Sequence, residues 1–195
     1  MREEYKSLAA LFKQIHGDWS VSQRDWTRPG FRAVAVHRFG VWVRNKRPRI
    51  LRATLFRVYQ MMYRYVRNHY GIELPDTTVV GRRLIIGHQG GIVIHPRSEI
   101  GDDCLIRQNV TIGAASDDRW WEAPRLGHGV QVGCGAVVIG KISIGDGARI
   151  GPNAVVMTNV PPGATAFAPP PRIIQLPKTE TDEMGVRAAL SGRIE

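Results

Sequence analysis

The sequence predicts a mainly β protein with an α-helical N-terminal segment, in which the β part is a parallel β-helix. The first observation is an aliphatic residue that recurs every six positions in two phased runs. A helix face returns every three or four residues and a strand face every two, so a sustained period of six requires one short strand plus one turn. The runs are Ile94, Ile100, Ile106 and Ile112, then Leu126, Val132, Val138, Ile144, Ile150 and Val156.

The second observation is the pattern of small residues around these positions. Glycine often follows the aliphatic residue, and the residue four places after it is small or aliphatic, so each unit has two inward positions. Three units form one triangular coil, and stacked coils bury their aliphatic side chains in a central column while parallel backbones pair from coil to coil. The second inward positions are Cys104, Val110, Val130, Ala136, Ala148 and Ala154.

Residues 1–70 are predicted to form a basic α-helical segment. Apolar stripes indicate helices over residues 1–16, 31–44 and 50–68. Gly17 is expected to end the first helix. The stretch that follows it is aromatic and polar and closes on a Pro-Gly pair, which predicts a loop before the second helix.

The net charge of +10 is concentrated in this segment, which holds 15 Lys and Arg residues against 4 Asp and Glu residues. One-sided charge favours an anionic partner such as a membrane surface, a phosphorylated lipid carrier or nucleic acid. The arginines are dispersed, however, so a solvated helical face is the simpler explanation. We expect no nucleic-acid partner and keep peripheral contact with a membrane or an anionic lipid carrier as an open alternative.

The remaining composition predicts a cytoplasmic protein without a disulfide framework. No apolar run is long enough to span a membrane, and the first residues carry acids and lack the apolar core of a signal peptide. The two cysteines, Cys104 and Cys134, fall in coil positions without a CxxC partner. We therefore expect free thiols that are buried or half-buried.

The β-helix is predicted over residues 71–160, with one interruption. The interval from Ile112 to Leu126 is longer than one six-residue repeat, so residues 113–125 are expected to leave the coil as a loop. Loops on rigid scaffolds often carry function. Residues 161–195 are predicted to form a proline-rich strap and flexible tail, because proline cannot continue backbone pairing.

One histidine is a candidate general base. His88 lies in the sequence IGHQGG at residues 86–91, where a phase shift of the repeat predicts an irregular corner. The glycines around it leave the imidazole open to a substrate and let a ligand approach the backbone. The histidines of the helical segment are more simply explained as packed or surface residues, and His95, before a proline, is as easily structural.

Five stretches of the chain carry a family resemblance: GFRAVAVHRFGVWV, YGIELPDTTVVGRRLIIGHQGGIVIHP, CLIRQNVTIG, GVQVGCGAVVIGKISIGDGARIGPNAVV and NVPPGATAFAPPPRII. Together they resemble the serine acetyltransferase family of hexapeptide-repeat acyltransferases. The similarity covers about residues 30–174 and is strongest from Tyr70 onward. It implies a left-handed β-helix, which departs from the usual right-handed crossover rule, assembled as a homotrimer with acetyl-CoA in the groove between neighbouring coils.

The resemblance implies specific roles for the matching residues. His88 falls on the family's catalytic histidine, the general base that deprotonates the acceptor hydroxyl for direct attack on the thioester. Glu73 falls on the carboxylate that orients this histidine. No covalent enzyme intermediate and no metal are needed. The positions implied to line the CoA arm or to approach its phosphates are Gly113, Gly133, Cys134, Arg149 and Pro152.

The predicted loop departs from the family pattern. Its family counterpart carries a histidine that contacts serine, and Ala123 stands at that place here. The adjacent Trp120 and Trp121 have two explanations. Indole rings offer a platform on which the apolar face of a sugar ring stacks, or the two side chains pin the loop against a neighbouring subunit.

The family's other serine-binding positions are also altered or ambiguous. The aspartate that precedes the catalytic histidine in the family is Gly87 here. The N-terminal serine-binding aspartate has two candidate counterparts, Asp18 and Asp25. The acceptor is therefore less well specified by the resemblance than the reaction is.

These features lead us to expect an acetyl-CoA-dependent O-acetyltransferase that acts on a sugar hydroxyl in polysaccharide or glycan assembly. L-serine acetylation is the nearest alternative. A gamma-type carbonic anhydrase is less favoured, because the histidines that would hold its zinc across subunits, His88, His95 and His128, are irregularly spaced. A non-catalytic scaffold whose basic helices bind lipid or nucleic acid is the remaining alternative.

Overall fold

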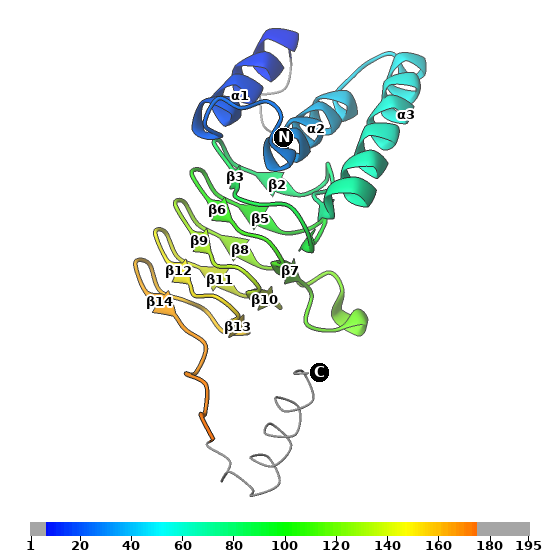
Figure 1. The fold of residues 1–195 in the computed structure, drawn as a ribbon. Helices are drawn as coiled ribbons and strands as arrows, with labels where there is room; N and C mark the ends of the chain where they lie inside the picture. The colour runs from blue at the N-terminus through cyan, green and yellow to red at the C-terminus, as the bar shows by residue number, and fades with distance from the viewer. Residues whose placement is uncertain (1–6, 175–195) are drawn as a thin grey trace, which may run out of the picture.

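A computed structural model describes residues 7–174 of the chain. Figure 1 shows a helical segment at one end and a coil of short parallel strands beneath it, with a loop that protrudes after β7. The helical segment consists of α1 (Leu8–Val21), α2 (Pro29–Arg44), α3 (Arg49–Tyr65) and a π-helical turn, η2 (Val66–Tyr70).

The coil has three sheets, in which every strand pairing is parallel. One sheet has the order β1-β4-β7-β10-β13, the second β11-β8-β5-β2 and the third β14-β12-β9-β6-β3. The predicted β-helix is confirmed, and it is left-handed as the resemblance implied. The strands are β1 (Ile72–Glu73), β2 (Val79–Val80), β3 (Ile85–Ile86), β4 (Ile92–Ile94), β5 (Glu99–Ile100), β6 (Leu105–Ile106), β7 (Thr111–Gly113), β8 (Arg125–Leu126), β9 (Gln131–Val132), β10 (Val137–Ile139), β11 (Ser143–Ile144), β12 (Arg149–Ile150), β13 (Val155–Val156) and β14 (Thr165–Ala166).

The predicted inward residues form the central column of the coil. Ile94 pairs with Ile112, which pairs with Val138 on the next coil, and all three are buried. The second inward positions are buried as well, including Cys104. Burial raises the pKa of the Cys104 thiol to about 11, so this cysteine is an unreactive core residue.

The first helix is longer than predicted. The side-chain oxygen of Ser7 caps α1 by accepting the Ala10 N–H at 3.0 Å, and the helix continues past Gly17 to Val21. The predicted stop at Gly17 is therefore wrong. The physical reason is Asp18, which is buried and hydrogen-bonded to a residue of α2, so tertiary contacts outweigh the weak helix preference of one glycine.

A buried ion pair attaches the helices to the coil. Arg38 of α2 donates through Nε to the Asp18 carboxylate of α1 at 2.8 Å, and both side chains are 1% exposed. The same guanidinium donates to the backbone carbonyl of Val80 at 3.0 Å and to that of Gly81. One arginine therefore joins α1, α2 and the end of β2.

The coil extends further toward the C-terminus than residue 160, where the sequence placed its end. Val160 bridges to Ile144, and β14 pairs with β12. The proline pair at residues 161–162 lies in the turn between these two points, where no ladder N–H is required. Most of the predicted flexible tail, residues 175–195, lies outside the described residues. Within residues 7–174, none of the helices combines the length and hydropathy that a membrane-spanning helix requires.

A buried histidine predicts a pH-dependent stability. His37 of α2 hydrogen-bonds the Pro75 carbonyl oxygen through Nδ1 at 2.9 Å. Burial, with a smaller contribution from the charge of Arg38, lowers the pKa of His37 to about 3. The unfolded chain takes up a proton on this ring below about pH 6.5 and the folded protein does not. The free energy of unfolding should be highest above this pH and fall by up to roughly 1.4 kcal/mol per pH unit toward pH 3.

Urea unfolding at pH 7.5, 6.0 and 5.0 measures this slope, and His37→Gln isolates it from the carboxylates. The variant should be less stable than the wild type at pH 7.5 and show a shallower decline between pH 6.5 and 5.0. Equal slopes for the two proteins would show that His37 does not cause the decline.

Candidate active site

His88 lies at the corner between β3 and β4, and backbone contacts fix this corner on both sides. The Gly87 N–H donates to the Ile106 carbonyl at 2.9 Å, and the Gly90 N–H donates to the Tyr70 carbonyl at 2.9 Å. Gly90 has a φ of +100°, a conformation that side chains with a Cβ rarely adopt. The glycines therefore shape a tight corner from which the His88 ring projects as an exposed group.

The His88 ring opens into a cavity of about 480 Å³ between the coil and the start of α2. Arg28 and Gly30 line one wall, and Gln108 lines the other. Gly30 allows this close approach, because a Cβ built on it would lie 2.2 Å from the Ile86 carbonyl oxygen. The side-chain oxygen of Gln108 is buried and has no hydrogen-bond partner within the described part of the chain. The cavity thus presents an imidazole and a guanidinium, and one of its lining residues carries a buried acceptor without a partner.

The two candidate acceptor-binding aspartates differ in the structure. Asp25 accepts from the Thr27 N–H at 2.8 Å and from the Thr27 hydroxyl at 2.6 Å, and these hydrogen bonds lower the pKa of Asp25. Its carboxylate also lies 3.9 Å from Nε of Arg28, which lines the His88 cavity. The Asp18 carboxylate is instead buried and paired with Arg38, so it is not accessible to an acceptor. Asp18 therefore has a structural role. Of the two aspartates, only Asp25 is left as a candidate for contact with the acceptor.

Glu73 occupies β1 and lies opposite Val93 of β4 in the sheet. It is half-buried, and after burial itself its charge is the largest influence that raises the pKa of Tyr63. No hydrogen bond joins the Glu73 carboxylate to the His88 ring in residues 7–174. Catalytic hydrogen bonds are often long before ligands bind, and the orienting role of Glu73 stays a prediction.

The residues implied for CoA binding fall into two places. Gly133 and Arg149 line one groove of about 280 Å³, together with Arg107 and Phe167. Cys134 follows Gly133 in the turn after β9, and its carbonyl accepts the Asn153 N–H at 2.9 Å.

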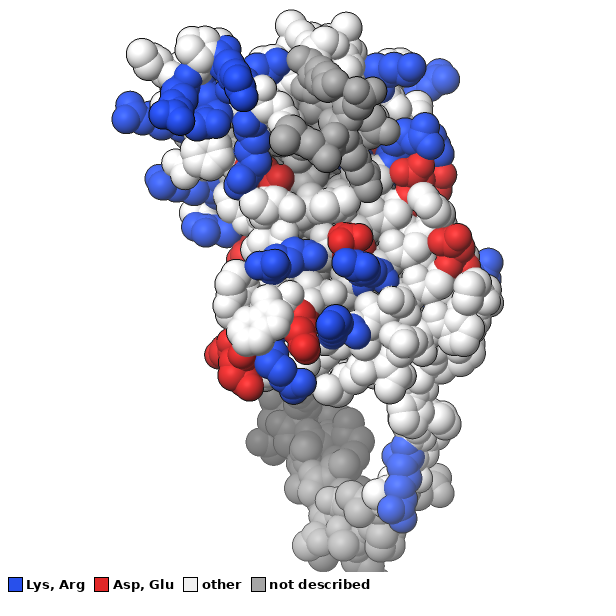
Figure 2. Space-filling model, turned by 180° about the vertical axis from the view of Figure 1, so that it is seen from behind, with Lys and Arg blue, Asp and Glu red and all other residues white. Residues whose placement is uncertain are grey.

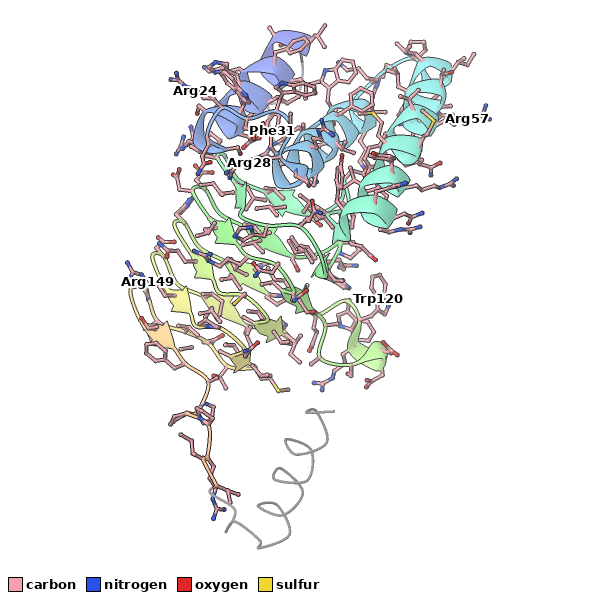
Figure 3. The ribbon with its side chains drawn as sticks, viewed as in Figure 1. Arg24, Arg28, Phe31, Arg57, Trp120 and Arg149 are labelled. Carbon is pink, nitrogen blue, oxygen red and sulfur yellow. The ribbon has the colours of Figure 1, made fainter. Side chains whose placement is uncertain are left out.

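Pro152 lies beside this groove, because a Cβ on Gly133 would come within 2.8 Å of the Pro152 nitrogen. Gly113 ends β7 in another sheet, and its carbonyl accepts the Gly140 N–H at 2.9 Å. Four of the five residues predicted to bind CoA therefore lie in or beside one groove of a single chain. Figure 3 shows Arg149 at the outer edge of the coil.

The predicted loop leaves the coil after β7 and contains one 3-10 turn, η3 (Asp117–Arg119). Trp120 packs against its own coil, with its ring centroid 6.1 Å from that of His95 and 5.5 Å from the Arg97 guanidinium carbon. Trp120 and Trp121 remain 52% and 53% exposed. Figure 3 shows Trp120 on this protruding loop. Contacts within the chain therefore cover part of the Trp120 ring, and about half of each tryptophan stays accessible.

The histidines of the carbonic anhydrase alternative lie in unrelated settings. Nδ1 of His128 accepts the Asp102 N–H at 3.0 Å, and the His128 backbone N–H donates to Asp146 at 2.7 Å. Nδ1 of His95 accepts the Arg97 N–H at 3.2 Å, and burial lowers the pKa of His95. Among residues 7–174, no three His, Cys, Asp or Glu side chains gather closely enough to hold a metal ion. His95 and His128 thus have structural roles in their turns.

Three residues of these sites were missed by sequence reasoning. Arg28, Gln108 and Arg107 line the His88 cavity or the Arg149 groove, but none of them belongs to a chemically distinctive motif. Gln108 follows Arg107 in a repeat unit and reads as an ordinary turn residue. The packing of the start of α2 against β3 brings Arg28 to the His88 cavity, and the coil register brings Arg107 and Gln108 beside residues about twenty positions away.

Comparison with known proteins agrees with this geometry. Residues 123–157 match the family described as bacterial transferase hexapeptide (six repeats). Serine acetyltransferase of Salmonella typhimurium is 32% identical over 163 residues, which are 84% of this chain and 57% of that protein. The Mycobacterium tuberculosis serine acetyltransferase is 35% identical over 146 residues, which are 75% of this chain and 61% of that protein. By these matches the chain is similar to the serine acetyltransferases among the hexapeptide-repeat transferases.

Solved structures of this family share the fold. A serine acetyltransferase in complex with CoA superposes with a TM-score of 0.70 at 26% identity and covers 88% of this chain and 73% of that one. Soybean serine acetyltransferase complexed with serine gives a TM-score of 0.70 at 25% identity, covering 84% of this chain and 69% of that one. The chain spans about three fifths of the length of the two sequence relatives named above.

Proposed function

We propose that the protein is an O-acetyltransferase that uses acetyl-CoA as cosubstrate. The observation that carries this proposal is the exposed His88 ring at a rigid glycine corner, facing a cavity with Arg28 and Gln108. His88 takes the proton of the acceptor hydroxyl as the hydroxyl oxygen attacks the thioester carbonyl carbon. The carbon–sulfur bond then breaks, and the imidazolium returns the proton to the leaving CoA thiolate. No metal takes part in this transfer.

The neighbours of His88 have supporting roles in this proposal. Glu73 orients the ring and stabilises its charged form as ligands close the site. Arg28, held by Asp25, presents a cation to the acceptor. The unpartnered Gln108 oxygen accepts a hydrogen bond from an N–H or O–H donor of a bound ligand, which would satisfy a buried polar atom.

The CoA arm is proposed to follow the later coils, with Arg149 and Arg107 at its phosphates and Gly133, Cys134 and Pro152 contacting it through the backbone. That a relative of the same fold is solved in complex with CoA supports CoA as the ligand. Gly113 lies in a different sheet and is proposed to meet the cofactor of a neighbouring subunit. A homotrimer would supply that neighbour, and light scattering in solution measures the assembly.

Arg149→Ala is expected to raise KM for acetyl-CoA by roughly tenfold or more, because a charge-assisted hydrogen bond to phosphate contributes about 1.5–3 kcal/mol. The kcat should change little, since the phosphates lie far from the thioester. Arg83→Ala is the matched control, because Arg83 pairs with Asp103 outside the groove. An unchanged KM in the Arg149 variant would remove this residue from the CoA site.

L-serine is the first candidate acceptor, because the curated relatives are named serine acetyltransferases and a soybean relative is solved with serine. A sugar hydroxyl is the second candidate. It is favoured by the two half-exposed tryptophans of the loop and by Ala123, which replaces the family's serine-contacting histidine. The role in polysaccharide or glycan assembly belongs to this second candidate only.

Acceptor-dependent CoA release separates the two candidates. The initial rate should be measured with acetyl-CoA and either L-serine or a panel of free and nucleotide-linked sugars. Saturable release with L-serine alone would establish the first candidate and reject the sugar. Turnover restricted to a sugar, and lost in Trp121→Ala but retained in Trp19→Ala on α1, would establish the second.

A further inference from the structure

Helix α3 carries an apolar stripe on its exposed side. Members at positions 51, 58, 62 and 65 are spaced by seven, four and three residues and therefore share one face. A contiguous exposed apolar surface of this kind often marks a site of interaction with a protein or a membrane. The α3 stripe consists of Ile50, Leu51, Val58, Met61, Met62 and Tyr65, whose side chains are between 38% and 82% exposed.

The α3 stripe is continuous with an apolar groove of about 870 Å³ between α1, α2 and α3. Met61, Met62 and Tyr65 line both surfaces. The charged residue in the lining is Arg32, which donates to the Tyr70 hydroxyl at 2.8 Å and to the Trp26 carbonyl at 3.1 Å. A groove with this lining suits an occupant that forms few hydrogen bonds, such as a hydrocarbon chain, better than a peptide.

The charge around the stripe identifies the partner. Residues 26–72 contain eleven Lys and Arg residues and no Asp or Glu. Figure 2 shows Lys and Arg gathered over the helical end, whereas both signs mix over the coil. Arg57 and Arg64 are exposed and lie seven positions apart beside the stripe, and Arg57 points away from the body of the protein (Figure 3). A second copy placed on this face would meet like charge, while lipid phosphates complement it.

We propose that the α3 stripe and its groove dock the protein on the surface of an anionic phospholipid bilayer. The stripe enters the boundary between headgroups and acyl chains, and Arg57 and Arg64 reach the phosphates, as in an interfacial amphipathic helix. Trp26, 66% exposed at the groove, suits the same interface. Because Arg28 lies two residues after Trp26 and lines the His88 cavity, docking holds the proposed active site beside the bilayer.

Co-sedimentation with vesicles tests this proposal without any acetyl transfer. The full chain should bind vesicles of equal phosphatidylglycerol and phosphatidylcholine at least about tenfold more tightly than vesicles of phosphatidylcholine alone, and less tightly as salt rises. His88→Ala should bind as the wild type does, so a failure of the proposed reaction would leave this result intact. Absence of binding to the anionic vesicles would overturn the proposal.

Matched variants locate the contact. Met61→Glu should weaken vesicle binding at least about tenfold, because it places a carboxylate in the stripe. Met157→Glu makes the same change at a similarly exposed methionine of the coil and should bind as the wild type does. Arg57→Glu with Arg64→Glu should also lose at least about tenfold.

Circular dichroism and light scattering should show that these variants keep their helix content and assembly. Equal binding by the Met61 and Met157 variants would overturn the assignment to α3. A change of oligomeric state in Met61→Glu without any wild-type vesicle binding would assign the face to a second copy instead.

Discussion

Replacing His88 with alanine is expected to lower kcat for acetyl transfer by about 100- to 10,000-fold, the usual contribution of a positioned general base. The imidazole is exposed at a corner whose backbone is fixed by Ile106 and Tyr70, so its removal should leave the coil intact. The measurement is acceptor-dependent CoA release at saturating substrate concentrations. KM for acetyl-CoA should stay close to the wild-type value, because the Arg149 groove is a separate cavity.

His16→Ala supplies the matched control for this result. His16 is also exposed, but it lies on α1 with its ring tilted against that of Trp19, the ring centroids being 5.6 Å apart. Its variant should keep kcat within about twofold, as expected for a surface substitution. A His88 variant that retains most of the wild-type kcat with the same acceptor would refute the role of His88 as the base.

Removal of Asp18 is expected to lower the free energy of unfolding by about 3–5 kcal/mol, because Asp18→Ala leaves the Arg38 charge buried without its carboxylate. Arg38 is fully buried and also joins α2 to the carbonyls of Val80 and Gly81. The loss should therefore loosen the attachment of the helices to the coil. Urea unfolding at pH 7.5, followed by circular dichroism, measures it.

Two controls separate this ion pair from ordinary charge effects. Asp103→Ala breaks a more exposed pair with Arg83 and should cost less than about 1 kcal/mol. Asp18→Leu combined with Arg38→Met removes both charges and should recover much of the stability lost in the single variant. If Asp18→Ala were as stable as Asp103→Ala, the pair would not anchor the helices.

The repeat predicted the coil well because the residue types within each six-residue unit indicate which of its positions are buried. An inward Ile112 or Val138 is aliphatic whatever the neighbouring coil contains, and the period alone requires a strand and a turn. The helix ends were less predictable. Gly17 is a poor helix former, but Asp18 beside it contacts Arg38, twenty residues away, and no local pattern reveals that contact.

The candidate site shows the same division. His88 could be identified because its glycine neighbours disturb the repeat and because the surrounding sequence resembles a known family. Asp18 and Asp25 could not be separated, since the partner that buries Asp18, Arg38, lies twenty residues away. Gln108 could not be found, because its unpartnered oxygen is a property of the assembled cavity and not of its own segment.

The position of a bound acceptor shows directly whether His88 acts as the general base. A crystal structure of the protein with CoA and L-serine, or with the sugar that supports turnover, gives the distance from the acceptor hydroxyl oxygen to the nearest His88 ring nitrogen. We expect about 2.6–3.2 Å, the range that proton transfer to a general base requires, with the CoA phosphates near Arg149. An acceptor hydroxyl bound away from His88, or CoA bound outside the Arg149 groove, would contradict this account.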